Sequence, residues 1–103
     1  MRMWNVDPRG MCRKHLLGEH VEMHMFAGTI RTGKSLDGFL TGGLVEPRKI
    51  RRRHSELAKE MQRRGYNHKS PLASYGISKF PRGYVDIKKN VLELQRRCNE
   101  CFK

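Results

Sequence analysis

Two carboxylates and a histidine are spaced along His15–Arg31 so that they could carry out acid–base chemistry. His15, Glu19 and Glu22 follow one another at intervals of four and three residues, which places them along one side of a helix. On such a helix, a partly buried carboxylate close to cationic groups forms either a structural ion pair or a general acid–base. The residue types alone leave both interpretations open, and Glu22 is the carboxylate we single out as a catalytic candidate.

Two patterns of potential metal ligands are incomplete. His20 and His24 lie one helical turn apart, but the zinc-protease pattern requires glutamate directly after the first histidine, where this sequence has valine. Cys98 and Cys101 form a C-x-x-C pair, which is half of a zinc site, and the other half would have to come from Cys12 or a histidine. The alternative is that these cysteines pack in or next to a helix. We therefore predict no metal and no cofactor.

The segment Gly28–Ser35 matches the letters of a phosphate-binding loop, G-x-x-x-x-G-K-S. Such a loop requires a strand before it and a helix after it whose N–H groups point at the phosphate. Here the preceding segment has a helical pattern, and the glycine-rich segment that follows predicts a loop around a small apolar patch. A nucleotide-binding module is thus an alternative, and a turn in which Lys34 contacts a DNA phosphate is favoured.

The chain carries 22 lysines and arginines against 10 aspartates and glutamates, which gives a net charge of +12 spread along its length. Such a surface favours binding to phosphate backbones, with an affinity that falls steeply as salt rises. Because phosphate contacts position a protein without reading sequence, we expect recognition of damage or structure. The candidate phosphate contacts are Arg31, Lys34, Arg48, Lys49, Arg51, Arg52, Arg53, Lys69 and Arg97. The aromatic residues that could wedge into or stack on DNA, or else pack in the core, are Trp4, Phe26, Tyr66 and Tyr84.

At 103 residues the chain is long enough for one domain. The patterns of apolar residues, prolines and glycines predict an extended arm over residues 1–11 and helices at about 12–26, 47–64 and 85–97. Glycine- and proline-rich segments separate these helices. The predicted fold is therefore all-α, a single small domain of about three helices with long irregular connections.

The sequence predicts a cytoplasmic protein, either nucleoid-associated or phage-encoded. No stretch approaches the ~20 apolar residues of a membrane span, and the first residues lack the apolar run of a secretory signal. The odd number of cysteines, three, argues against an extracellular disulfide framework. We expect no membrane partner.

Two segments of the chain resemble helices of the phage-type pyrimidine-dimer DNA glycosylase/AP lyase family, also called the endonuclease V type. The first carries H-L-L-x-E-x-x-E over His15–Glu22 and ends at Arg31, and the second carries H-x-E-L from His54 and R-G-Y-N at Arg64–Asn67. A weaker similarity begins at R-G-Y, Arg82–Tyr84, and continues into the last predicted helix. No single piece is specific, but their combination is.

The resemblance implies a mechanism and names its residues. In that family the N-terminal α-amine attacks C1′ of the damaged nucleotide, forms an imine with the sugar and is assisted by a helix-borne glutamate. By position that glutamate is Glu22, the basic residue beside the nucleophile is Arg2, and a histidine near the site is His15, for which a buried structural role is the alternative. The nucleophile is then the amine of Met1, and an α-amine, with an ordinary pKa of about 7.7–8.0, is neutral at pH 7 far more often than lysine at about 10.4.

The sequence also departs from the family pattern. Family members that recognise cyclobutane dimers grip DNA with arginines on the glutamate's helix, and the matching positions here are Val21 and Met25. We therefore expect a monomeric DNA repair glycosylase and AP lyase that acts on double-stranded DNA with damaged or abasic sites, without assigning the lesion. The alternative is a non-catalytic DNA-binding or architectural protein on the same scaffold.

Overall fold

The computed structural model describes residues 1–68, 70–76 and 82–103, and within them it contains helices and no strands. Three long helices, α1 (Arg13–Arg31), α3 (Ile50–Arg63) and α4 (Ile87–Arg97), match the three predicted helices. A short helix, α2 (Asp37–Thr41), and two 3₁₀ turns, at Pro8–Gly10 and Pro47–Lys49, complete these elements. The predicted all-α class is therefore confirmed. None of the described helices is long and apolar enough to cross a membrane.

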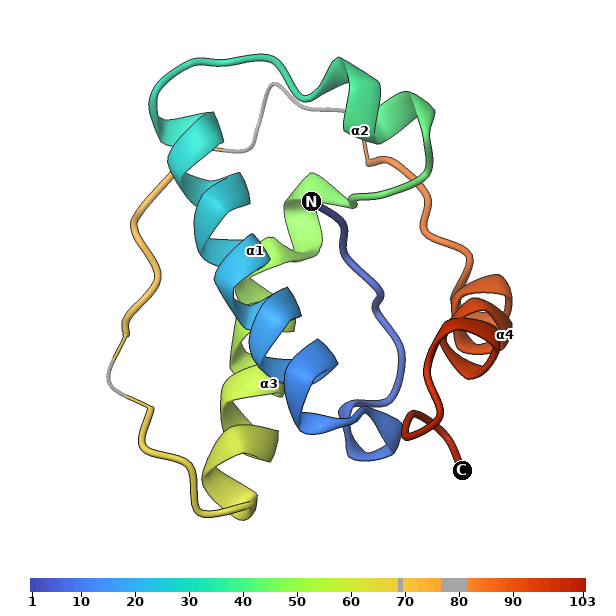
Figure 1. Cartoon of the computed structure of the whole chain (residues 1–103). Helices are drawn as coiled ribbons and strands as arrows, with labels where there is room; N and C mark the ends of the chain where they lie inside the picture. Colours follow the sequence, from blue (N-terminus) through green and yellow to red (C-terminus); the bar gives the residue numbers. More distant parts are fainter. Residues whose placement is uncertain (69, 77–81) are drawn as a thin grey trace.

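The helices α1 and α3 run antiparallel, side by side, and form the centre of the fold (Figure 1). The Cys12 side chain caps α1 by accepting a hydrogen bond from the backbone N–H of His15. α3 begins after the 3₁₀ turn at Pro47, and beyond its end Gly65 adopts a φ of +85°, a conformation that glycine adopts readily and that commonly follows the end of a helix. Both signals were predicted from the sequence.

α1 is one turn longer than the predicted segment, because it continues through Gly28 to Arg31. A glycine inside a helix costs about 1 kcal/mol relative to alanine. The buried side chains of Ala27 and Ile30 on either side of it offset this cost. Because Gly28–Arg31 is helical, this segment does not form a phosphate-binding loop, and the nucleotide-binding alternative is not supported.

The helix α2 corrects the prediction of a loop between the first two long helices. Leu36, directly before it, is buried, and the ring of Phe39 meets the ring of Phe26 edge-on at 5.3 Å. This packing stabilises a turn of helix that its glycine-rich sequence would not form alone. The same packing shows that Phe26, with no exposed surface, is a core residue and is not available to stack on DNA.

The N-terminal arm lies between the α1–α3 pair and α4 (Figure 1). Met3, Trp4 and Val6 are buried, and the N–H of Met3 donates a hydrogen bond of 2.6 Å to the carbonyl of Leu44. Trp4, only 5% exposed, is therefore a second core residue among the four predicted stacking candidates. The arm is built into the core, which fixes the position of its first residues.

Candidate active site

A buried ion pair holds the arm against the two central helices. Glu19 of α1 and Arg53 of α3 are each 1% exposed and form two hydrogen bonds, of 2.6 and 2.8 Å. Glu19 also accepts from the backbone N–H of Trp4 at 3.1 Å, and Arg53 donates to the carbonyl of Val6 at 2.7 Å. Both charges are thus paired and bonded to the arm, which is the condition for burying an ion pair without a large net cost.

Arg53 was predicted to contact DNA phosphates, and this prediction is wrong. Its guanidinium group is enclosed between α1, α3 and the arm, so no phosphate reaches it. It is among the largest fully buried side chains in the described part of the protein. Arg53 has the same side chain as its neighbours Arg51 and Arg52. The signal that separates it from them is its spacing from Ile50 and Leu57, which puts it on the inner face of α3.

Glu22 lies one turn beyond Glu19 on α1, close to the first residues of the arm, and is half-buried. Burial raises the pKa of Glu22 above its ordinary value, and the α-ammonium group of Met1 acts against this by stabilising the carboxylate. The backbone N–H and the positive charge of Arg2 act in the same direction as Met1. The structure therefore brings together three of the predicted catalytic residues, Met1, Arg2 and Glu22.

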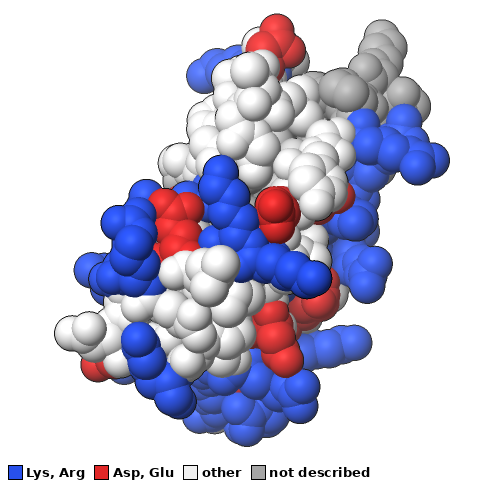
Figure 2. Space-filling view, turned by 90° about the vertical axis from the view of Figure 1, so that its right-hand side faces the viewer, with Lys and Arg blue, Asp and Glu red and all other residues white. Residues whose placement is uncertain are grey.

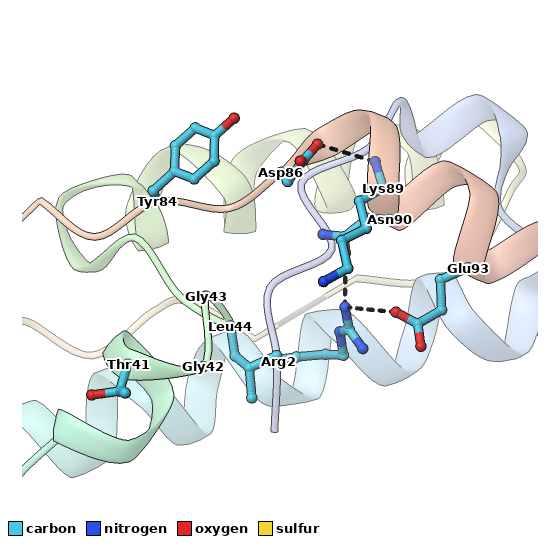
Figure 3. Close-up of a pocket in the computed structure, with 10 residues that line it drawn as sticks. All are labelled: Arg2, Thr41, Gly42, Gly43, Leu44, Tyr84, Asp86, Lys89, Asn90 and Glu93. Carbon is cyan, nitrogen blue, oxygen red and sulfur yellow. Dashed lines mark hydrogen bonds and ion pairs between the residues drawn. The ribbon is translucent and has the colours of Figure 1, made fainter.

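Arg2 is held by α4. Its guanidinium group donates to Asn90 Oδ1 at 2.7 Å and lies 3.5 Å from Glu93 Oε2 (Figure 3). It also stacks over the ring of Trp4, 3.7 Å from the ring centroid. Asn90 is buried and also donates to the carbonyl of Trp4 at 2.8 Å. α4 thereby fixes both the side chain of Arg2 and the backbone of the arm. Neither Asn90 nor Glu93 was predicted, since a polar residue on a helix gives no sign of a partner 88 positions away.

A pocket of about 370 Å³ opens next to Arg2. The end of α2 with residues 42–44, the start of α4 and Tyr84 line it (Figure 3). Tyr84 is 71% exposed, so among the four aromatic candidates it has the surface needed to stack on a base. The volume lies within the range of small-ligand pockets.

Two exposed apolar side chains flank Glu22 on α1. Val21 is 55% and Met25 is 50% exposed, at the two positions where the resembling family carries arginines. The buried face of α1 instead contains Leu16, Met23 and the polar Glu19. The carboxylate therefore has exposed apolar side chains next to it on α1, in addition to the charges of Met1 and Arg2.

Most of the predicted phosphate contacts are on the surface. The exposed members are Arg31, Lys34, Arg48, Lys49, Arg51, Arg52 and Arg97. Lys69 lies outside the described residues. Figure 2 shows lysine and arginine side chains across the middle, along the margins and at the lower end of the face that carries α4, with carboxylates between them. One such pair joins Arg97 to Glu93 at 2.7 Å, so this arginine supports the same carboxylate that contacts Arg2.

His15 is not placed with the other three catalytic candidates. It lies two helical turns from Glu22, which is about 10 Å along the helix axis. Its Nδ1 atom is 3.1 Å from the sulfur of Cys12 and 3.5 Å from that of Cys101. The prediction that His15 lies near the active site is therefore corrected, and His15 belongs to a separate cluster.

The remaining four histidines meet between α1, α3 and the segment after α3. The rings of His20, His24, His54 and His68 lie 4.7–5.3 Å apart, and the Nε2 atoms of His20 and His68 are 2.7 Å apart. Such a contact requires one donor and one acceptor, so the two rings cannot both be protonated. Burial, helped by the neighbouring rings, lowers the pKa of His20 to about 4. Burial also lowers the pKa values of His24 and His54.

The fold and site define a class of protein, a small and basic all-α domain whose N-terminus is fixed beside a half-buried glutamate. A family model described as pyrimidine dimer DNA glycosylase matches residues 1–74. The chain therefore belongs to the pyrimidine dimer DNA glycosylase family, which implies DNA glycosylase activity and a DNA substrate. The match contains the arm, α1 and α3, and ends before α4. No curated protein and no solved structure gives a match.

Proposed function

We propose that this protein is a DNA repair glycosylase with AP-lyase activity, in which the α-amine of Met1 is the nucleophile and Glu22 is the acid–base group. The observation that supports this proposal best is the anchoring of the N-terminal arm. Glu19 and Asn90 bind its backbone at Trp4, and Arg53 binds it at Val6, which keeps the amine of Met1 close enough to Glu22 to act on the pKa of Glu22. Without these hydrogen bonds the arm would not keep the amine of Met1 in place beside Glu22.

In the proposed reaction the neutral amine attacks C1′ of the damaged nucleotide. A bond forms between the Met1 nitrogen and C1′, and the bond from C1′ to the base breaks, so that the base leaves with the electron pair and is protonated. The sugar ring opens as its oxygen departs from C1′, which leaves an imine between Met1 and the sugar. Removal of a proton from C2′ then expels the 3′-phosphate by β-elimination. Water finally hydrolyses the imine and restores the amine.

Glu22 has the environment that these proton transfers require. A carboxyl group whose pKa is raised by burial gives and takes protons closer to neutral pH than an exposed one. As a carboxylate it also stabilises the positive charge that develops on the sugar as the base leaves. Arg2 is fixed by Asn90 and Glu93. Its positive charge attracts the DNA phosphate next to the reacting sugar.

The DNA must expose its target nucleotide for this chemistry, at a cost of a few kcal/mol that is smaller at damaged or abasic sites. We assign the pocket beside Arg2 to an extruded nucleotide and Tyr84, on its rim, to stacking. The apolar pair Val21 and Met25 faces the DNA beside Glu22, in place of the arginines of dimer-specific relatives. Pyrimidine dimers are the substrate that the family implies. Because Val21 and Met25 stand in place of those arginines, the abasic site is the first substrate to test.

The test is borohydride trapping on two duplexes, one with a single abasic site and one with a pyrimidine dimer. We expect a covalent protein–DNA product on the abasic duplex, and peptide mapping should locate the attached DNA on the Met1 nitrogen. Glu22→Gln should reduce strand cleavage by about two to four orders of magnitude, the usual contribution of an acid–base group, and leave DNA affinity nearly unchanged. Glu56→Gln on α3 is the matched control, because this carboxylate makes a loose ion pair with Arg52, at 3.9 Å, and the variant should cleave normally.

Two results would contradict the proposal. Full activity after the α-amine has been blocked, or after a residue has been added before Met1, would exclude this nucleophile. Tight and salt-sensitive binding with no trapped product on either duplex would favour the alternative, a non-catalytic DNA-binding protein on the same scaffold.

A further inference from the structure

A second cluster of reactive side chains lies at the start of α1, about two helical turns before Glu22. All three cysteines of the chain meet His15 there, and their four potential ligand atoms lie within 4.8 Å of one another. Cys12 and His15 come from the start of α1, and Cys98 and Cys101 come from the segment that follows α4. Cys12 and Cys98, whose sulfurs meet in this cluster, lie 86 positions apart in the chain.

The separations between these atoms suit a tetrahedral zinc ion. With Zn–S bonds of about 2.3 Å and a Zn–N bond of about 2.0 Å, the edges of a tetrahedron are about 3.8 Å between sulfurs and about 3.5 Å between sulfur and nitrogen. The Cys98–Cys12 sulfur separation is 3.8 Å, and His15 Nδ1 lies 3.5 Å from the sulfur of Cys101 and 3.1 Å from that of Cys12. A disulfide is a poor match, because its two sulfurs are about 2.05 Å apart.

Backbone amides surround the sulfurs in the way that thiolates require. The N–H of Cys12 donates to the sulfur of Cys101 at 3.3 Å, the N–H of Glu100 to that of Cys98 at 3.4 Å, and the N–H of His15 to that of Cys12 at 3.4 Å. Each sulfur thus accepts one backbone hydrogen bond, which stabilises negative charge on it. Cys12 and Cys101 are buried and Cys98 is half-buried, so deprotonation of all three sulfurs requires a cation beside them.

We propose that Cys12, His15, Cys98 and Cys101 form a structural zinc site. Three sulfurs and one imidazole nitrogen fill all four tetrahedral positions, which is typical of structural zinc, whereas catalytic zinc keeps a position open. This proposal departs from the sequence-based prediction of no metal. It pairs the C-x-x-C motif, Cys98–Cys101, with a C-x-x-H motif, Cys12–His15, near the other end of the chain.

The zinc site has a consequence for the position of α4. It fastens the tail behind α4 to the start of α1, where the N–H of Phe102 also donates to the carbonyl of Gly10 at 2.6 Å. α4 in turn carries Asn90 and Glu93, which hold Arg2. Zinc therefore keeps in place the helix that supports the N-terminal arm, although the ion itself lies away from Glu22.

The test measures metal directly, so that it does not depend on DNA cleavage. We expect the purified full chain to contain one equivalent of zinc by mass spectrometry. After exchange with Co²⁺ it should show the thiolate-to-cobalt charge-transfer bands and the intense visible bands of a tetrahedral site. Cys98→Ser should lose or strongly weaken these bands. His68→Gln, in the other cluster of potential ligands, is the matched control and should retain them with an unchanged metal content.

A second measurement covers the case in which Cys98→Ser fails to fold. In the zinc-loaded wild-type chain all three thiols should react slowly with a thiol reagent until a chelator is added. Immediate reaction of the folded, zinc-supplemented chain, or cobalt bound without charge-transfer bands, would overturn the proposal. Loss of zinc from His68→Gln but not from Cys98→Ser would also overturn it, because the ion would then belong to the histidines.

Discussion

Two adjacent arginines on α3 have opposite roles, because the helix turns one inward and the other outward. Arg53 is buried in the bidentate pair with Glu19, and Arg52 is exposed with a loose contact of 3.9 Å to Glu56. Removing one partner of a buried pair leaves an uncompensated charge, which costs far more than the net value of the pair. A charge on the surface contributes little to stability but acts on a polyanion.

Arg53→Met and Arg52→Met should therefore give opposite results. We expect Arg53→Met to lower the free energy of unfolding by about 3–5 kcal/mol, because the carboxylate of Glu19 remains buried. Arg52→Met should change stability by less than about 0.5 kcal/mol. It should instead weaken DNA binding and reduce the slope of log affinity against log salt by about 1, the value for one lost phosphate contact. Urea unfolding and salt-dependent binding titrations measure the two effects.

At the scale of elements, the arm and the connecting segments place the site, and the long helices provide the support. The segment that leads into α4 passes close to the segment that leads into α3, where Gly83 has a φ of +69° and a β-carbon would collide with the carbonyl of Val45. This close approach positions Tyr84 at the pocket. Gly18, in contrast, lies inside α1 with open space around it.

Replacing these two glycines by alanine should therefore shift stability in opposite directions. Gly83→Ala combines a strained backbone conformation with a collision against main-chain atoms, so we expect a loss of more than about 1 kcal/mol. Gly18→Ala should add about 0.8–1 kcal/mol, because alanine favours the helix and meets no other atom. Thermal unfolding of the two variants beside the wild type tests this, and a stabilised Gly83→Ala would show that the two segments do not pack as described.

At the scale of the whole molecule, the lowered pKa values of His20, His24 and His54 make stability depend on pH. In the unfolded chain a histidine takes up its proton near pH 6.5, whereas in the folded state His20 takes it up only near pH 4. Between these values the unfolded state binds more protons, so stability rises with pH. The contribution of the cluster is fully present above about pH 6.5 and is lost as the pH falls toward 4.

We expect the free energy of unfolding to drop by about 2–3 kcal/mol from His20 alone as the pH is lowered through this window. Hydrogen bonds from Arg63 and Arg64 lower the pKa of Glu60 to about 2. The contribution of Glu60 to stability is therefore lost only below about pH 4.5. Urea unfolding between pH 7 and 5 therefore reports mainly on the histidines. His20→Gln should flatten the dependence, and a wild-type stability that is constant or increases toward pH 5 would contradict this account.

The sequence by itself determined the helices and the kind of partner. The periodic apolar residues, the proline before α3, the glycine after it and the net charge of +12 are local or additive properties, which do not depend on how the helices meet. For the same reason the E-x-x-E spacing placed Glu19 and Glu22 one turn apart on α1. Membership in the glycosylase family follows from these helical motifs together with the arm.

Only the tertiary structure decided which charged residue belongs to the core and which histidine belongs to which cluster. Arg53 became a buried partner of Glu19, and His15 joined cysteines from the other end of the chain. Val21 and Met25, two apolar residues of α1, stayed on the surface. Each outcome depends on contacts between residues that are distant in sequence. Whether a charge can be buried, or an apolar group left exposed, depends on the free energy of its interaction with the groups that the fold places next to it.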